Sequence, residues 1–238
     1  CVLIKDINDN LRKEIQGLDK DFASFAVQPN MVSEMRENWT SFDDVLADFA
    51  SKYRVRAKKC VKHGSHLELR EFTADDIQKH NDTIMKLFKN VEAGADFHMV
   101  SIHPRYFVDL KAALEDHFVI KGYFKNEELI GFYSYIKGVG KNYASFVGLN
   151  YDYNRECSLY QNILYHLLDD SIKDGAESID LARTAMEIKS TMGAEPHNYQ
   201  LMVKHLNPLT NSILKRFIQN LRPKEWTQRK PFKDYPKS

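Results

Sequence analysis

The sequence has few cysteines, almost no net charge and no long apolar run. Its three cysteines, Cys1, Cys60 and Cys157, form no closely spaced pair, which is typical of a reducing compartment rather than of a disulfide framework. The net charge of +1 excludes a global attraction to nucleic acid or anionic lipid, so any such attraction must be local. No apolar stretch approaches the roughly 18 residues of a membrane span, and no secretory signal pattern opens the chain. We therefore expect a cytoplasmic protein without a membrane span.

The composition is otherwise that of an ordinary globular protein. The 238 residues are 43% hydrophobic and 28% charged, which predicts one large domain, or one domain with part of another. Because the chain begins with Cys1 rather than methionine, we expect a fragment with sequence missing upstream.

The N-terminal segment predicts short strands and one long basic helix. Residues 2–7 and 22–27 have strand character, and residues 8–16 form a short polar helix that ends at Gly17. Residues 42–64 have apolar side chains at helical spacing, with Ser41 and Asp44 as a capping box and Gly64 as the stop. The later turns of this helix carry a cationic run: Lys52, Arg54, Arg56, Lys58, Lys59 and Lys62.

The rest of the chain predicts a mixed sheet with helices on its faces. After a strand at residues 66–72, Thr73 and Asp76 cap a helix, and a second helix runs from Pro104 to about residue 115. Residues 117–124, 129–136 and 143–151 are strands whose short connections require an antiparallel meander. A long amphipathic helix (158–173), a strand (177–182), a short helix, a strand (197–206) and a last helix from Asn207 to about Leu221 complete the order.

This order of elements resembles that of the GNAT acyltransferase superfamily. Residues 119–136 (VIKGYFKNEELIGFYSYI) resemble its second and third strands. Residues 179–196 (IDLARTAMEIKSTMGAEP) resemble a segment of Fem-type peptidyltransferases in which a strand ends in a small residue and arginine, followed by a K…GA(E)P pattern. Residues 39–59 (WTSFDDVLADFASKYRVRAKK) resemble the basic helix that links the two GNAT-like lobes of that group.

The resemblance implies an α/β fold whose central, mostly antiparallel, twisted sheet has splayed fourth and fifth strands flanked by helices. Residues 1–65 are then a partial first GNAT-like lobe that ends in the basic connector helix. Residues 66–222 are a GNAT-like acyltransferase domain, and residues 223–238 are a basic C-terminal tail.

The segment before the long helix departs from the superfamily pattern. GNAT enzymes carry a glycine-rich loop there that binds the pyrophosphate of coenzyme A, whereas residues 152–160 (DYNRECSLY) contain no glycine. Fem-like members also lack the usual loop, and several use aminoacyl-tRNA. The resemblance therefore leaves two donors open, acyl-CoA as a co-substrate or aminoacyl-tRNA, and implies no tightly bound cofactor. The acceptor is a small-molecule or peptide amine.

Candidate donor-binding residues lie between the fourth strand and the long helix. A helix N-terminus favours phosphate, and Asn154, Arg155 and Ser158 lie at this one; alternatively, Asn154 or Ser158 only caps the helix and Arg155 is solvated. Gly148 and Asn150 share one face of the preceding strand. Gly148 marks either a bulge that a donor approaches or a plain packing position.

Candidate catalytic residues are Tyr160, Arg183 and Glu187. Arg183 ends a buried strand at the lip of the implied splay, so its guanidinium needs a carboxylate or a bound anion as partner. Thr184 and Glu187 have the spacing of a capping box, so a structural role for Glu187 is the commoner one, and Lys189 is expected on a solvated helix face. Tyr160 is a proton donor, a stacking platform or an ordinary core residue.

The sequence gives little support for a metal or for a cysteine nucleophile. His63 and His66 have an H-x-x-H spacing in a turn, but without a third ligand we expect no metal. A helix N-terminus lowers a thiol pKa, but Cys157 has no base partner in the sequence, so we expect a structural cysteine.

Three functions are compatible with these residues. The leading hypothesis is an N-acyltransferase that moves an acetyl or aminoacyl group to an amine, in cell-wall or peptide-conjugate metabolism. The second is a GNAT-fold module that has lost catalysis and binds a ligand or a protein. The third is a tRNA-dependent aminoacyl transferase in which the basic helix contacts RNA.

Overall fold

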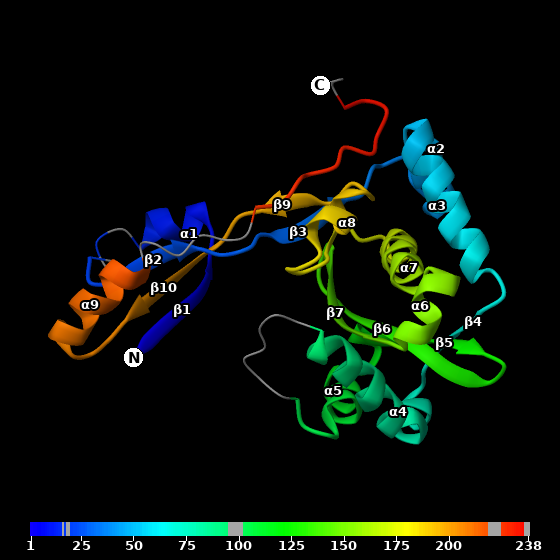
Figure 1. Cartoon of the computed structure of the whole chain (residues 1–238), viewed down its shortest axis with the longest axis horizontal. Coiled ribbons are helices and arrows are strands. Elements are labelled where there is room, and N and C mark those ends of the chain that lie inside the picture. Colours follow the sequence, from blue (N-terminus) through cyan, green and yellow to red (C-terminus); the bar gives the residue numbers. More distant parts are fainter. Residues whose placement is uncertain (16, 18–19, 95–101, 219–224, 236–238) are drawn as a thin grey trace.

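The computed structural model describes residues 1–15, 17, 20–94, 102–218 and 225–235. Its main body contains a seven-stranded sheet in the order β4-β5-β6-β7-β8-β3-β9, shown in Figure 1. The strands are β3 (Asn30–Glu34), β4 (Glu68–Glu71), β5 (Phe118–Lys125), β6 (Glu128–Lys137), β7 (Lys141–Leu149), β8 (Ser178–Asp180) and β9 (Glu195–His197).

Helices cover both faces of this sheet. The core on one face is formed with α2 (Phe42–Asp48), α3 (Ser51–Gly64) and α7 (Leu159–Lys173). The core on the other face is formed with α4 (Ala74–Ala93) and α5 (Tyr106–Leu114). The predicted mixed α/β architecture, with helices on the faces of a central sheet, is confirmed.

The predicted meander is also confirmed, because β5, β6 and β7 pair antiparallel in sequence order. The next pairing, β7 with β8, is parallel and covers only Lys141↔Ser178 to Tyr143↔Asp180. Strand β7 continues to Leu149, where it still pairs with β6. The fourth and fifth strands of the predicted GNAT-like unit therefore separate after a short contact, as the resemblance implied.

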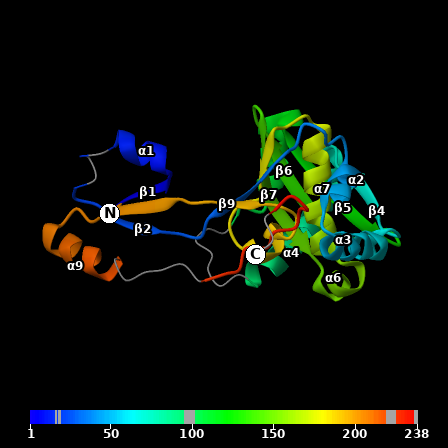
Figure 2. The same ribbon diagram turned by 90° about the horizontal axis from the view of Figure 1, so that it is seen from above.

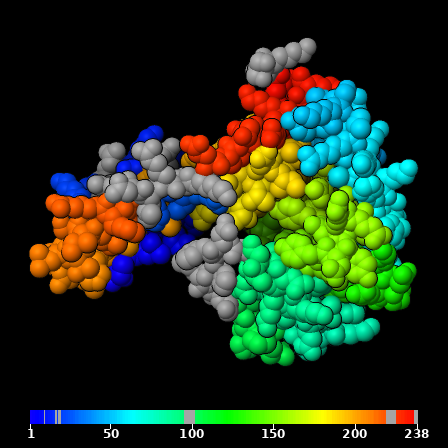
Figure 3. All heavy atoms as spheres, viewed as in Figure 1, coloured from blue at the N-terminus to red at the C-terminus, as the bar shows by residue number. Residues whose placement is uncertain are grey.

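A second sheet forms an arm that projects from the main body (Figures 2 and 3). It contains β1 (Val2–Ile7), β10 (Gln200–Lys204) and β2 (Ala23–Ala26), in that order. Helices α1 (Asp9–Glu14) and α9 (Pro208–Ile218) belong to this arm. The predicted end of the last helix near Leu221 lies outside the described residues. The segment 1–65 thus contributes strands to both sheets, and its reading as part of a first lobe stays a prediction.

Two predicted helical segments differ from the structure. The single helix expected at 42–64 is divided, because Phe49 is extended and Ala50 donates its N–H to the Pro231 carbonyl at 2.8 Å. The glycine-free segment before α7 is not a loop but a further helix, α6 (Tyr151–Cys157). Ser158, in the left-handed region with φ of 49°, separates α6 from α7.

Two of the three predicted capping boxes are present in the structure. The capping boxes of Ser41 with Asp44 and of Thr73 with Asp76 are both present. The one predicted for Thr184 and Glu187 is wrong, because α8 (Met186–Ser190) begins after Ala185, which has φ of 49°, and no side chain caps it. Thr184 itself has φ of 69°, a conformation that does not suit an N-cap residue.

The C-terminal segment packs against the main body rather than standing free. Phe232 is 8% exposed and contacts the rings of Trp39 and Phe49. The guanidinium of Arg36 lies 4.4 Å from the centre of the Phe232 ring. In Figure 3 the red segment crosses the yellow one toward the cyan helices.

Candidate functional site

The edge of β7 that β8 leaves unpaired is the most distinctive feature of the sheet. Beyond the last pair, Tyr143↔Asp180, the backbone N–H groups of β7 that face away from β6 have no partner among the described strands. Tyr143 is 46% exposed, and residues 144–147 are only half-buried although they lie in the middle of a seven-stranded sheet. Unpaired N–H groups at such a position can stabilise an oxyanion.

A β-bulge lies on this open edge. Ala144 pairs with Tyr135 and Val147 pairs with Tyr133, so Ser145 and Phe146 together stand opposite Ser134. The buried Ser134 hydroxyl accepts from the Phe146 N–H and donates to the Phe146 carbonyl, both at 3.0 Å. A bulge changes the direction of backbone groups and side chains locally. The Ser134 hydroxyl stabilises this bulge in place of the regular backbone hydrogen bonds between β6 and β7.

Gly148 lies beyond the bulge and is paired regularly with Phe132. A Cβ added at Gly148 would lie 2.2 Å from the Phe132 ring and 2.8 Å from the Leu87 Cβ. The packing interpretation therefore accounts for this glycine, because Leu87 and Phe132 belong to the core beneath α4.

The residues predicted to bind a donor gather at α6 and at the start of α7. Asn150 caps α6 by accepting from the Asp152 N–H. The Asn154 side chain accepts from the Tyr160 N–H at 2.9 Å, so it caps α7 from the preceding helix. Ser158 lies 3.1 Å from the Nδ1 of His63. Arg155 is exposed, and no carboxylate of a described residue forms an ion pair with it.

Tyr160 lies in the first turn of α7 and packs against the main core. Burial raises the pKa of its phenol to about 12. The phenol is therefore protonated at neutral pH, as a proton donor to a leaving group must be.

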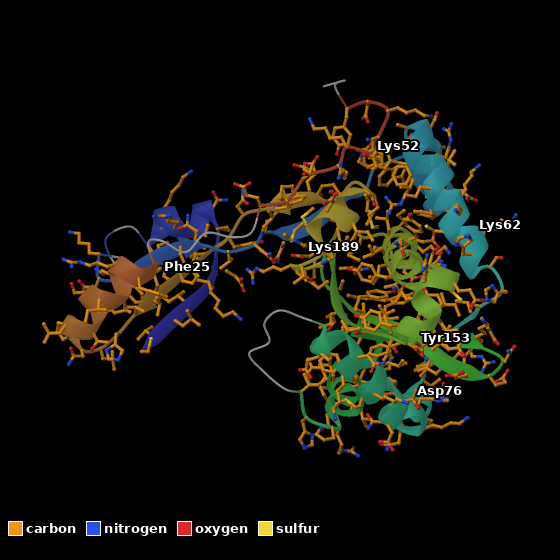
Figure 4. All side chains as sticks on the ribbon, in the orientation of Figure 1. Phe25, Lys52, Lys62, Asp76, Tyr153 and Lys189 are labelled. Atoms are coloured by element: carbon orange, nitrogen blue, oxygen red, sulfur yellow. The ribbon has the colours of Figure 1, made fainter. Side chains whose placement is uncertain are left out.

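A strained turn follows β8. Ala182, Thr184 and Ala185 all have positive φ, at 58°, 69° and 49°. Such residues cost of order 1–2 kcal/mol each, so the turn needs support from its surroundings. The support comes from Lys189 on α8, which is 4% exposed and is labelled beside α8 in Figure 4.

The Lys189 amine lies among the carbonyls of this turn. Its Nζ donates to the carbonyls of Leu181 at 2.6 Å, Arg183 at 2.8 Å and Ala182 at 3.2 Å. Burial lowers the pKa of Lys189 to about 7, and Asp180 opposes this shift. The expected solvated position of Lys189 is wrong, because α8 turns this side chain inward.

Arg183 and Glu187 both have protein partners in the structure. Arg183 forms an ion pair with Asp6 and donates from Nε to the Gln28 carbonyl at 3.0 Å. The Glu187 carboxylate accepts from the Nε of Arg229 at 2.9 Å. Among the described residues, no hydrogen bond or ion pair joins these two residues to the group at α6 and α7.

Glu187 also lines a cavity of about 370 Å³ between α3, α8 and the C-terminal segment. Lys52, Arg56 and Arg229 line the same cavity, and Lys52 lies at the upper end of α3 in Figure 4. In the described part of the chain, the cations of the predicted basic run form no ion pair with a carboxylate. This cavity is therefore a cationic surface feature that is separate from the open edge of β7.

Sequence reasoning missed two features of this region. The charge of Lys189 alone predicts a solvated side chain. The small residues of the turn before α8 were the available signal that this side chain is buried. The bulge at Ser145 and Phe146 was placed at Gly148 as one alternative, because glycine is the usual local signal. Only the pairing register of β6 with β7 reveals its true position.

In the described residues, no helix has the length and apolar character that a membrane crossing requires. No protein-family model and no curated protein matches the chain.

Several solved structures have a similar fold. One is the C-terminal domain (DUF2156) ascribed to a lysylphosphatidylglycerol synthetase of Agrobacterium fabrum, with a TM-score of 0.62 at 10% identity, covering 91% of this chain and 71% of that one. FemX matches with a TM-score of 0.60 at 12% identity, covering 92% of this chain and 74% of that one. L-PGS from Bacillus licheniformis matches with a TM-score of 0.59 at 10% identity, covering 91% and 72%. The protein therefore has a GNAT-like, Fem-like fold.

Proposed function

We propose that this protein transfers an acyl or aminoacyl group from an activated donor to an amine. The observation that carries the proposal is the open edge of β7, where strand pairing with β8 ends at Tyr143 while β7 continues to Leu149. The fold shared with FemX and with a domain ascribed to a lysylphosphatidylglycerol synthetase supports the same class of chemistry. The acceptor is a small-molecule or peptide amine, and the cytoplasmic location remains a prediction.

The chemistry follows from the groups along this edge. The donor carbonyl lies against the unpaired N–H groups near the bulge, which stabilise the oxyanion that forms when the amine attacks. The amine then loses its proton to solvent water. The leaving group takes a proton from Tyr160, whose phenol is protonated at neutral pH and regains its proton from water afterwards. The phosphate end of the donor lies toward α6, where Arg155 has no carboxylate partner among the described residues and can contact phosphate.

Two donors fit these groups, and the cations of α3 favour one of them. The described part of α3 carries six cations and no carboxylate, and Figure 4 shows Lys62 projecting outward at its lower end. This arrangement favours aminoacyl-tRNA over acyl-CoA, because RNA has phosphates along its length for a basic helix to contact. Acyl-CoA remains the alternative, with its phosphates at Arg155.

A specific observation also favours a second function, that of a binding module without turnover. The N–H of Phe146 at the bulge is already bonded to Ser134, and the start of α7 is already capped by Asn154. In such a module the same open edge binds a ligand whose carbonyl is not attacked.

The test combines binding and turnover on the full chain. Thermal unfolding is followed with acetyl-CoA, longer acyl-CoAs and bulk aminoacylated tRNA at low and moderate salt, and transfer of a labelled acyl group to amine acceptors is measured in parallel. We expect one donor class to raise the unfolding midpoint, and Arg155→Ala to weaken that donor at least about tenfold. The matched control is Arg105→Ala, at an exposed arginine that directly precedes α5. We expect this substitution to leave donor binding unchanged.

The outcomes separate the proposals. A steep loss of binding with salt identifies tRNA as the donor. Binding without transfer supports the binding module. If no donor of either class stabilises the chain, or if Arg155→Ala binds like the parent, the proposed donor site is wrong.

A further inference from the structure

Three side chains with metal-binding atoms meet at the junction of α3, β4 and the α6–α7 elbow. They are His66, in the turn after α3, and Glu156 and Cys157, the last residues of α6. Their ligand atoms all lie within 4.8 Å of one another. The Cys157 Sγ lies 3.7 Å from the His66 Nε2. The fold thus supplies further ligands for His66, although not for His63.

The separation of the sulfur and the imidazole nitrogen fits one tetrahedral metal ion. Zinc–sulfur and zinc–nitrogen bonds of about 2.3 and 2.1 Å at a tetrahedral angle separate the two ligand atoms by about 3.6 Å. The observed separation of 3.7 Å between Cys157 Sγ and His66 Nε2 agrees with that value. A carboxylate oxygen of Glu156 completes a set of three ligands on one side of the ion.

The kinds of donor atom also select the metal. A thiolate and an imidazole are borderline or soft ligands, which favour zinc over magnesium or calcium. Cys157 is fully buried, whereas His66 and Glu156 are exposed, so an ion reaches the set from the solvent side. We infer that His66, Glu156 and Cys157 form a zinc site with three protein ligands and a fourth position open to water or an exogenous ligand.

Binding requires small changes in bonding and the loss of one proton. The Cys157 thiol releases its proton to solvent and its sulfur bonds to zinc, while neutral His66 donates the lone pair of Nε2. One oxygen of Glu156 accepts from Lys125 at 2.9 Å, and the second oxygen remains for the metal.

The site would fix the elbow that carries the predicted donor-binding residues. Glu156 and Cys157 directly follow Asn154 and Arg155 on α6, and Ser158, which contacts His63, comes next. A bound ion joins this elbow to the turn after α3, two segments that are distant in the sequence. This role does not depend on the proposed function, because a binding module gains the same rigidity.

The experiment uses the full chain in a Cys1→Ser background, since the exposed Cys1 thiol binds metals itself. The protein is stripped with a chelator, and zinc binding is measured by calorimetry. Cobalt(II) is then added, and thiolate ligation is read from the sulfur-to-cobalt charge-transfer absorption. We expect one ion per chain, a charge-transfer band, and at least about tenfold weaker zinc binding in His66→Ala and Glu156→Gln.

Matched controls separate this set from its neighbours. His63→Ala, at the other histidine of the pair, and Cys60→Ser, at the other buried cysteine, keep the zinc affinity and the cobalt band. Cys157→Ala abolishes the cobalt band, and circular dichroism shows whether this variant stays folded. If Cys157→Ala unfolds, His66→Ala carries the test, because His66 is exposed. The absence of zinc binding in the parent, or an unchanged affinity in His66→Ala, overturns the inference, and neither result bears on donor binding.

Discussion

Replacing Lys189 with methionine removes an amine from the turn after β8 while leaving a side chain of similar length. In the parent, the buried Nζ donates to the carbonyls of Leu181 and Arg183 at 2.6 and 2.8 Å, and more weakly to that of Ala182 at 3.2 Å. A neutral amine has two hydrogens and satisfies the two short contacts. The structure is therefore compatible with an uncharged Lys189 in the folded protein.

The magnitude follows from the change in pKa. Burial lowers the pKa of Lys189 from 10.5 to about 7, so between these values the unfolded chain binds a proton that the folded chain does not. The free energy of unfolding then rises with pH by about 1.4 kcal/mol per unit in this window. From pH 7.5 to pH 9.5, the parent should gain about 3 kcal/mol relative to Lys189→Met, which has no group to titrate at this position.

Urea unfolding of both proteins at pH 7.5 and pH 9.5 measures this difference. We expect the destabilisation caused by Lys189→Met to be small at the lower pH and large at the higher one. A difference that stays the same at both pH values would refute the reasoning, because it would mean that the carbonyls hold a charged ammonium throughout.

Two further predictions concern core packing and helix capping. Phe232→Ala should lower the free energy of unfolding by about 3 kcal/mol, because the ring is 8% exposed and packs on Trp39 and Phe49. The control in the same urea titration is Lys230→Ala, at an exposed neighbouring residue. Equal effects of the two substitutions would contradict the packing role of Phe232. Asn154→Ala should cost about 1 kcal/mol by uncapping α7, and a neutral result in the same assay would show that water replaces this cap.

Much of the fold was predictable because its determinants are local. Thr73 and Asp76 begin α4 through contacts three residues apart, and the short connections after β5 and β6 permit only antiparallel neighbours. The apolar stripe of α7 likewise predicted a buried helix, and α7 does line the core. Each of these signals operates within a few residues, so a single sequence contains it.

Most of the failed predictions depend instead on contacts between residues that are distant in the sequence. The break between α2 and α3 depends on Pro231 and Phe232, which lie far along the chain. Glu187 has the spacing of a capping partner but bonds to Arg229 instead. Lys189 is buried only because the turn before it presents its carbonyls toward α8.

The sequence by itself determined the classes of the main elements, the antiparallel meander and the broad resemblance to an acyltransferase fold. Only the tertiary structure decided where the unpaired edge of β7 lies, which cations have carboxylate partners, and that His66 meets Glu156 and Cys157. The physical reason is that helix caps and strand periodicity depend on neighbouring residues. A functional site depends on backbone and side-chain atoms brought together by packing from segments that the sequence keeps apart.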